Sequence, residues 1–268
     1  MGRIRIKSCL LAALLALPLS CSIKEDRSAC PCLLTVDLSR TLDAGITPPS
    51  WWDKGLYIAL FKDGNGCFSK DKLKLSEAQP EYDYRVEKGD VGVTGILGLD
   101  AGSLSGNEIR YREGCQSDRL YVSSRVVPCY GEVARTALEM YKQFSNIEIT
   151  GLDTFDYRME VTAGCDGLDV LSRQALEGTF RFVLTCDPEG VCRFRMPRQD
   201  KDDLKILLWR ADGQLDNALP LGAYLTKIGY DWNAPSLSDV SIHVDFVTAS
   251  ISITVDDWTQ SITFPYTI

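Results

Sequence analysis

The chain has 268 residues and an acidic balance, with 29 basic against 37 acidic side chains and a net charge of −8. A surplus of negative charge repels the phosphate backbone of nucleic acids and the anionic surface of lipid bilayers. The composition therefore argues against a nucleic-acid-binding protein, and the length is sufficient for two domains of ordinary size.

The N-terminus has the pattern of an export signal that ends at a lipidation site. Three basic residues precede an eleven-residue apolar run, Cys9–Leu19, which fits a secretory signal and is too short to span a bilayer. The run ends at Ser20-Cys21, an arrangement typical of bacterial lipoproteins, although Pro18 departs from the usual lipobox. We expect residues 1–20 to be a signal peptide and Cys21 to carry acyl chains, palmitate among them. The alternative is ordinary cleavage near Ser20, which would leave Cys21 as a thiol.

The residues that follow Cys21 favour a tether on the outer membrane. Residues 21–29 are short, charged and without a core-forming pattern. Lys24, Glu25 and Asp26 resemble the surface-export signal of Bacteroidetes lipoproteins, and the alternative is a solvated linker without an address. Because stable anchoring takes more than one acyl chain, a triacylated cysteine would hold the mature protein on the membrane. We therefore expect a surface-exposed lipoprotein of the cell outer membrane.

Trp51 and Trp52 stand next to the Pro48-Pro49 turn. At an exposed loop tip these rings would stack on sugars. The further aromatic members of such a platform would be Tyr57, Tyr82, Tyr84, Tyr230 and Trp232. The competing interpretation is that the aromatic side chains close the ends of hydrophobic cores. A surface glycan-binding lipoprotein is therefore the alternative function for this chain.

Short apolar runs with a period of two recur from one end of the chain to the other. Their members are Leu34, Val36 and Leu38; Leu56–Phe61; Val91 and Val93; Ile147 and Ile149; Met159 and Val161; Phe180, Phe182 and Leu184; Phe194 and Met196; Ile206–Trp209; Val240, Ile242, Val244 and Phe246; Ile251, Ile253 and Val255; Ile262 and Phe264. Gly, Pro, Asp and Asn separate the runs. Alternation of this kind at a spacing of about ten residues predicts an all-β sandwich.

One segment in the middle of the chain carries a weak helical pattern. In Gly131–Phe144, three apolar residues stand at helical spacing, so we interpret it as a linker that could be helical. This interpretation divides the mature chain into an N-terminal β-sandwich domain, residues 30–141, and a C-terminal β-sandwich domain, residues 142–268. The second domain would open with a strand over Lys142–Thr150.

Eight cysteines remain after Cys21, and an even number in an exported chain predicts disulfides. They are Cys30, Cys32, Cys67, Cys115, Cys129, Cys165, Cys186 and Cys192. The sequence leaves most of the pairing open. Cys186 and Cys192 flank a Pro/Gly turn and are the candidate for a cross-strand disulfide. A zinc site is not expected, since Cys30 and Cys32 have one residue between them, where zinc motifs have two to four.

The residues do not favour catalysis. His243 is the single histidine of the chain, and it stands on the polar phase of an alternating strand, where it should face solvent. The acidic pair Asp202-Asp203 would point to opposite faces of a strand and would not converge on one substrate. We therefore expect no catalytic residues, no metal and no small-molecule cofactor.

The C-terminal stretch from Asp256 to Ile268 has Ile262, Phe264 and Tyr266 on one phase. Such a strand can pair with another subunit through main-chain hydrogen bonds, or it can close a sheet within its own chain. The sequence leaves this choice open.

Several local strings, taken in order, resemble the FimB-type fimbrillin-associated anchor lipoproteins of Bacteroidetes fimbriae. They are Cys30-Pro31-Cys32 with the strand to Ser39, Lys88-Gly89-Asp90-Val91-Gly92-Val93, Lys142-Gln143-Phe144 with the strand to Ile149, Met196-Pro197-Arg198-Gln199, Gly229-Tyr230-Asp231-Trp232, and Ile251–Trp258. The resemblance implies two tandem transthyretin-like β-sandwiches and no catalytic activity. It also implies a role in cell adhesion, as a protein at the fimbrium base that holds the shaft subunits, the fimbrillins, on the outer membrane.

Overall fold

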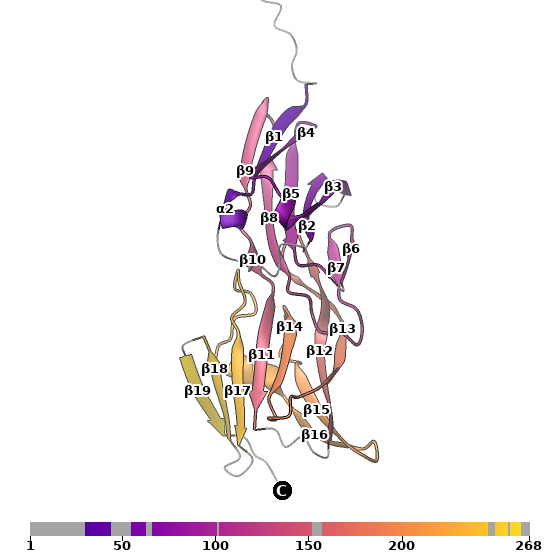
Figure 1. Ribbon diagram of the computed structural model, residues 1–268, viewed down its shortest axis with the longest axis vertical. Helices are drawn as coiled ribbons and strands as arrows, with labels where there is room; N and C mark the ends of the chain where they lie inside the picture. Colours follow the sequence, from indigo (N-terminus) through magenta and orange to yellow (C-terminus); the bar gives the residue numbers. More distant parts are fainter. Residues whose placement is uncertain are drawn as a thin grey trace, which may run out of the picture.

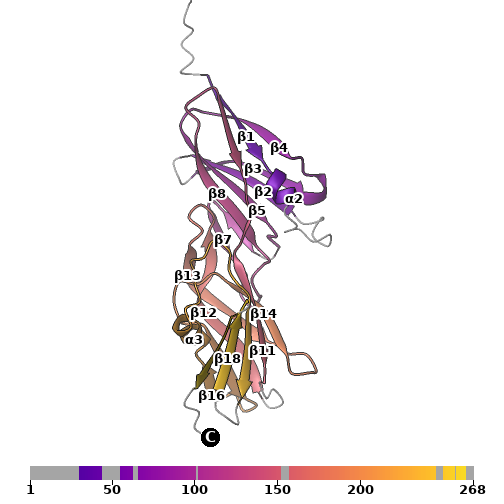
Figure 2. The ribbon, with the colours of Figure 1, turned by 90° about the vertical axis from the view of Figure 1, so that its left-hand side faces the viewer.

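The computed structural model describes residues 30–43, 55–62, 66–100, 102–151, 157–245, 250–256 and 258–263. The described part is nearly all β and forms two pairs of sheets that follow one another along the long axis of the molecule (Figures 1 and 2). The prediction of an all-β sandwich is thus confirmed. No helix in the described part of the chain is both long and apolar enough to cross a bilayer.

Sheets A and B form the end of the molecule at which the described chain begins. Sheet A contains, in spatial order, β4 (Glu81–Val86), β1 (Cys32–Asp37) and β9 (Val133–Ala137). Sheet B contains β10 (Tyr141–Lys142), β8 (Tyr121–Pro128), β5 (Asp90–Leu97), β2 (Gly55–Lys62) and β3 (Gly66–Lys74). The short helix α2 (Ser39–Asp43) follows β1, and the single 3-10 turn η4 (Leu75–Glu77) follows β3.

Sheets C and D form the other end. Sheet C contains β16 (Leu215–Leu219), β15 (Lys205–Arg210), β12 (Tyr157–Asp169), β7 (Glu108–Arg110) and β6 (Ser103–Ser105), and β13 (Ala175–Leu184) pairs with β12. Sheet D contains β14 (Cys192–Pro197), β11 (Phe144–Thr150), β17 (Val240–Asp245), β18 (Ser250–Val255) and β19 (Trp258–Thr263). Helix α3 (Leu221–Lys227) lies between β16 and β17 in the chain.

Alternation along the strands produces the two apolar cores. In β17, Val240, Ile242 and Val244 are buried, while Ser241 and His243 between them are exposed. Because successive strand residues point to opposite faces, one face of each sheet becomes apolar and packs against its partner sheet. Burying each large aliphatic side chain contributes about 1.5–3 kcal/mol, so the pattern that predicted the strands is also the source of their stability.

Strands β6 and β7 join the two ends of the molecule. They lie within residues 30–141, yet β7 pairs with β12 in sheet C, with Ile109 opposite Leu168. Ile109 is fully buried in a core that also contains Phe61 and Ile96 of sheet B. The apolar core of the C-terminal half therefore continues into the N-terminal half, and the division into two domains at residue 141 stays a prediction.

The interpretation of residues 131–144 as a linker that could be helical is wrong. Val133–Ala137 is strand β9, which pairs in parallel with β1 along its whole length, and Tyr141–Lys142 is strand β10. The helical spacing of three apolar residues was coincidental, because pairing with β1 supplies backbone hydrogen bonds that a short isolated helix would have to make alone. The expected opening strand of the second half is present as β11.

A buried arginine fastens the loop before β17 to the ends of β11 and β14. Arg198 is 4% exposed and donates hydrogen bonds to the carbonyl oxygens of Trp232 and Ala234 and to Oε1 of Gln143. Gln143 is itself fully buried and donates to the carbonyl of Pro235. Burial lowers the pKa of Arg198, but an arginine stays charged at neutral pH. We call this group the Arg198 latch.

Replacing Arg198 by Met should lower the free energy of unfolding by about 2–4 kcal/mol, because several buried carbonyl groups lose their donor. Urea unfolding followed by circular dichroism would measure the change. Arg40→Met is the matched control: Arg40 is highly exposed and its ion pair with Glu139 should be worth less than about 1 kcal/mol. Equal stability of the two variants would contradict the structural role of the latch.

A carboxylate at the end of β1 ties this strand to β9. Asp37 accepts hydrogen bonds from Nη2 of Arg135 at 2.8 Å and from the backbone N–H of Ser39 at 2.9 Å. The hydrogen bond from Arg135, followed by the one from Ser39, lowers the pKa of Asp37 from 3.8 to about 2. A carboxylate whose pKa is depressed by folding stabilises the protein above its unfolded pKa, and loses that effect as the pH falls through the folded pKa.

Asp37→Asn should therefore lower the free energy of unfolding by about 1–2 kcal/mol at pH 7, with allowance for screening by solvent. The difference from the wild type should shrink as the pH falls from about 4 towards 2. Urea titrations at several pH values would follow it, with the exposed turn residue Glu189 changed to Gln as the control. A difference that does not vary with pH would show that the Asp37 carboxylate contributes nothing through its charge.

Candidate functional site

The two edges of sheet D differ in how their backbone is satisfied, and the difference selects a candidate site. At the β14 edge, the N–H of Ser117 donates to the carbonyl of Arg195 at 3.3 Å, and the N–H of Arg195 donates to Oε1 of Gln116 at 3.2 Å. Nε of Arg195 also donates to the carbonyl of Ser117 at 2.9 Å. The loop before β8 thus covers this edge at Arg195, whose backbone N–H and C=O are both occupied.

A disulfide secures the entry to β14. Cys186 and Cys192 are joined across the Pro/Gly turn, with their Cα atoms 4.1 Å apart, and the two residues also form an isolated antiparallel bridge. This is the local pair that the turn sequence predicted. Asp187 in the turn accepts from the backbone N–H of Val191 at 2.8 Å and from Nη1 of Arg193 at 2.7 Å. The hydrogen bond from Val191 is the largest of the effects that lower the pKa of Asp187.

The β19 edge is of the opposite kind. β19 pairs with β18 over its whole length, and among the described residues no strand pairs with its other side. Its six residues, Trp258-Thr259-Gln260-Ser261-Ile262-Thr263, carry no charge. The described edge strands β3, β4, β9, β10, β13, β14 and β16 each contain at least one charged residue, and β6 has only three residues.

Charge on an edge strand is a common protection against pairing with other chains, with lysine especially effective. β3 shows this protection, since Lys70, Lys72 and Lys74 alternate along it. β19 lacks it, and its Thr, Ile and Trp residues favour extended structure. The uncharged edge of β19 is therefore the place in the described chain that is best suited to receive a strand from another subunit, and we call it the β19 edge.

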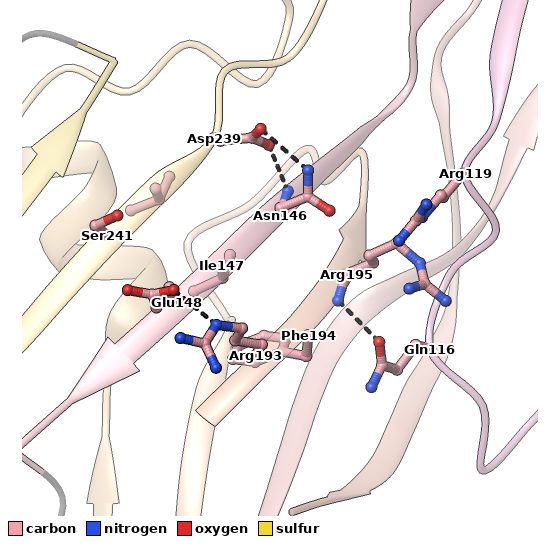
Figure 3. Close-up of a pocket in the computed structure, with 11 residues that line it drawn as sticks. Gln116, Arg119, Asn146, Ile147, Glu148, Arg193, Phe194, Arg195, Asp239 and Ser241 are labelled. Carbon is pink, nitrogen blue, oxygen red and sulfur yellow. Dashed lines mark hydrogen bonds and ion pairs between the residues drawn. The ribbon is translucent and has the colours of Figure 1, made fainter. Parts of the chain in front are cut away.

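A hollow of about 460 Å³ lies on the solvent face of sheet D, at the edge that β14 forms. Figure 3 shows the residues that line it. Asn146 and Glu148 of β11 and Arg193 and Arg195 of β14 are outward-facing residues that line it. The alternating partners, such as Ile147 and Phe194, are buried in the core. The hollow is accordingly polar, and its aromatic residue does not offer an exposed ring for stacking.

Most charges around the hollow are held by partners. The carboxylate of Asp239 accepts from the backbone N–H and from Nδ2 of Asn146, at 2.7 and 3.0 Å, and Nε of Arg193 donates to Glu148 at 2.8 Å (Figure 3). Arg119 lies beside Arg195. Desolvation and, second, the charge of Arg119 lower the pKa of Arg195. Two adjacent guanidinium groups favour an anion or a hydroxyl-rich ligand over an apolar one.

Most of the predicted site residues lie outside the part of the chain that the structure describes. Cys21, the export residues Lys24, Glu25 and Asp26, and the candidate glycan-stacking residues Trp51 and Trp52 lie outside the described residues, as do Phe246, Phe264 and Tyr266. These expectations stay predictions.

Other candidates from the sequence, for catalysis and for sugar stacking, lie in the described part of the chain. His243 is an exposed strand residue whose Nδ1 lies 3.0 Å from Oγ1 of Thr150, in agreement with the expected solvent-facing position. Asp203 accepts a hydrogen bond from the N–H of Gly164. Tyr230 and Trp232 pack edge to face, with ring centroids 4.7 Å apart, and are buried. These two rings belong to the core and not to an exposed sugar platform.

Sequence reasoning did not identify the hollow, because its side chains come from three strands and a distant loop. The alternation of Asn146 with Glu148 and of Arg193 with Arg195 showed which residues face outward, but not that β11 and β14 are neighbours. For β19, the sequence does show a run of six uncharged residues. It does not show that this run forms the edge of a sheet.

No protein-family model matches the sequence, and no curated protein matches it significantly. Solved structures do share its fold. The fimbrial anchor protein Mfa2 from Porphyromonas gingivalis is 10% identical, with a TM-score of 0.58, and the match covers 86% of this chain and 99% of that one. A candidate polysaccharide-binding protein from Bacteroides thetaiotaomicron has a TM-score of 0.63 at 13% identity, and the match covers 87% and 98% of the two chains.

A candidate adhesin from Bacteroides ovatus has a TM-score of 0.58 at 13% identity, and the match covers 90% of this chain and 97% of that one. At identities this low, the likenesses establish a shared all-β architecture over nearly the whole length of each neighbour.

Proposed function

We propose that this protein is an outer-membrane lipoprotein that anchors a fimbrial shaft on the cell surface, and that it contacts shaft subunits through the β19 edge. The observation that carries the proposal is the uncharged, unpaired side of β19, since main-chain hydrogen bonds to an added strand are a general mode of subunit recognition. The fold shared with a fimbrial anchor protein supports it.

The arrangement along the molecule also supports an anchor. β1 begins at one end of the long axis, close to where the tether of residues 21–29 would enter, and β19 lies towards the other end (Figure 1). A protein held by lipid at its first residues would thus present the β19 edge away from the membrane, where a shaft subunit could reach it.

Two lysines on β19 should block assembly while leaving the fold intact. Thr259 and Ser261 pair with Thr254 and Ser252 of β18, which alternate with the buried Ile251 and Ile253. We expect Thr259→Lys/Ser261→Lys to reduce incorporation into fimbriae by about tenfold or more, which corresponds to a loss of at least about 1.4 kcal/mol of association energy. Immunoblotting of sheared and purified fimbriae would measure it.

The matched control places two lysines at the paired positions of the neighbouring interior strand β18, as Ser252→Lys/Thr254→Lys, and should assemble normally. Two truncated chains distinguish the contribution of β19 from that of the residues after it. A chain that ends at Asp256 lacks β19 and should not be incorporated, whereas a chain that ends at Thr263 keeps it and should be. Normal fimbriae on cells with the lysine variant and with the chain ending at Asp256 would remove the β19 edge from the assembly role.

The lipid anchor is tested separately. Cys21→Ala should release the protein from membranes, because the acyl chains that supply roughly 0.8 kcal/mol per buried methylene can no longer be attached. Fractionation of cells into soluble and membrane material would show the release, and Cys67→Ala, an exposed thiol in β3, is the control that should stay on the membrane. Retention of the Cys21 variant would contradict lipidation at this residue.

Glycan binding is the second candidate function, and the hollow of Figure 3 favours it, because its guanidinium, amide and carboxylate groups suit the hydroxyl and acidic groups of sugars. The shared fold with a candidate polysaccharide-binding protein gives it further support. A glycan-array signal that disappears on Asn146→Ala and Arg195→Ala, with normal fimbrial assembly, would favour glycan capture over anchoring.

A further inference from the structure

Two buried cysteines meet where the folded chain begins. Cys32 is the first residue of β1, and Cys129 directly follows the last residue of β8. Both are fully buried in the core between sheets A and B, and both are present as thiols in this structure. They come from different sheets and are almost one hundred residues apart in sequence, so nothing in the local sequence pairs them.

Backbone hydrogen bonds on two sides hold the segments that carry Cys32 and Cys129 next to each other. Cys32 stands opposite Val86 at the end of β4, and the N–H of Cys129 donates to the carbonyl of Gly89 at 2.8 Å. Val86 ends β4, and Gly89 lies in the short turn that leads from it to β5. On the other side, the N–H of Leu33 donates to the carbonyl of Glu132 at 2.8 Å. Two sets of hydrogen bonds therefore hold the residues next to Cys32 and Cys129 together.

The two side chains belong to the same apolar cluster of buried residues. Burial, and then the neighbouring Cys32 with which it shares a hydrogen bond, raise the pKa of the Cys129 thiol to about 11. Cys165 shows what a buried cysteine looks like without such a neighbour, since its Sγ lies 2.9 Å from Oδ1 of Asp200. Two neighbouring thiols in an apolar core are candidates for oxidation to a disulfide, which needs sulfur atoms at close range and strands that already hold the Cβ atoms together.

We propose that Cys32 and Cys129 form a disulfide in the exported protein, and that this bond fixes the first residue of β1 to the end of β8. The proposal rests on the export that is part of the proposed function, because disulfides persist outside the cytosol. It does not depend on the partner bound at the β19 edge.

The Cys32–Cys129 bond would form by exchange with a disulfide carried by a thiol–disulfide oxidoreductase of the export compartment. One cysteine, as the thiolate, attacks the oxidant disulfide, forms a mixed disulfide and releases one oxidant thiol. The second cysteine then attacks the protein sulfur of the mixed disulfide, which forms the Cys32–Cys129 bond and releases the second oxidant thiol. The two protein thiols give up two electrons to the oxidant disulfide. Because both cysteines are buried in the finished fold, the exchange takes place during folding.

The disulfide would change how the protein carries a pulling force applied to the tether. A pull on the N-terminal tether enters the folded part at residue 30, two residues before Cys32. Without a cross-link, the load falls on the hydrogen bonds of β1 to β4 and β9, beginning at the end of the strand. With the disulfide, the load passes through a covalent bond to the end of β8, an interior strand of sheet B that pairs with β10 and β5, and β1 cannot be peeled away from its first residue.

Peptide mapping of protein taken from cells in the presence of an alkylating reagent tests the bond. Trypsin should release residues 28–40 joined to residues 126–135, and reduction should separate the two peptides. Since residues 28–40 also contain Cys30, the Cys30→Ser variant should keep the cross-link and Cys32→Ser should lose it. The Cys165 peptide, from a buried cysteine without a cysteine neighbour, should be fully alkylated after unfolding and serves as the internal control.

Thermal unfolding gives a second readout. A loop of about 100 residues closed by a disulfide should make the midpoint of unfolding fall by roughly 10 °C on reduction. Cys32→Ala/Cys129→Ala should lose most of this reductant-sensitive shift, whereas Cys186→Ser/Cys192→Ser should keep it.

Peptides that carry Cys32 and Cys129 as alkylated thiols, or joined to other cysteines, in protein from intact cells would overturn the proposal. Incorporation into fimbriae is scored on the same cells. A missing cross-link with normal fimbriae would leave the anchor function standing, and an intact cross-link with no fimbrial association would count against the anchor function alone.

Discussion

The pairing of backbone groups along strand edges is the constraint on which the rest of this structure depends. A sheet satisfies its interior strands automatically, but each edge leaves a row of N–H and C=O groups that must be covered, charged or used. The loop around Gln116 and Ser117 covers β14, and lysines protect β3. Strands β6 and β7 extend sheet C from a distant part of the chain. Among the described edge strands longer than three residues, β19 alone carries no charged side chain, and this is the observation on which the proposed association rests.

The Arg198 latch shows how the fold fastens its segments without a buried ion pair. A guanidinium with five donors can serve several carbonyl groups at once, so one side chain holds the loop at Trp232 and the segment at Gln143 against the end of β14. Three of the strings on which the resemblance to fimbrial anchor proteins rests, around Gln143, Arg198 and Trp232, meet here. Those strings therefore describe how the C-terminal half is held together, and they carry information about the fold more than about a ligand.

The contacts at the two ends of the molecule fit a protein that transmits force along its length. At the N-terminal end, β1 is held between β4 and β9, with Asp37, Arg135 and Glu81 linked across the three strands. In the middle, β7 and the shared apolar core connect the two pairs of sheets. At the far end, β18 and β19 are a hairpin at the margin of sheet D. The described chain thus has continuous connections from its first strand, β1, to the hairpin of β18 and β19.

Local sequence patterns were enough to predict the all-β class and most of the strands, and they singled out Cys186 and Cys192 as a candidate pair. Alternation is a local signal: Val240, Ile242 and Val244 mark a buried face whatever strand lies beside them, and a Pro/Gly turn brings flanking cysteines together over six residues. Which strands are neighbours became known from the three-dimensional fold. It turned residues 133–137 into a strand by placing them against β1, and it moved β6 and β7 into sheet C. It also buried Tyr230 and Trp232, and it brought Cys32 to Cys129 across two sheets. These features depend on contacts between residues far apart in the chain, and the period of a single strand contains no information about its partner.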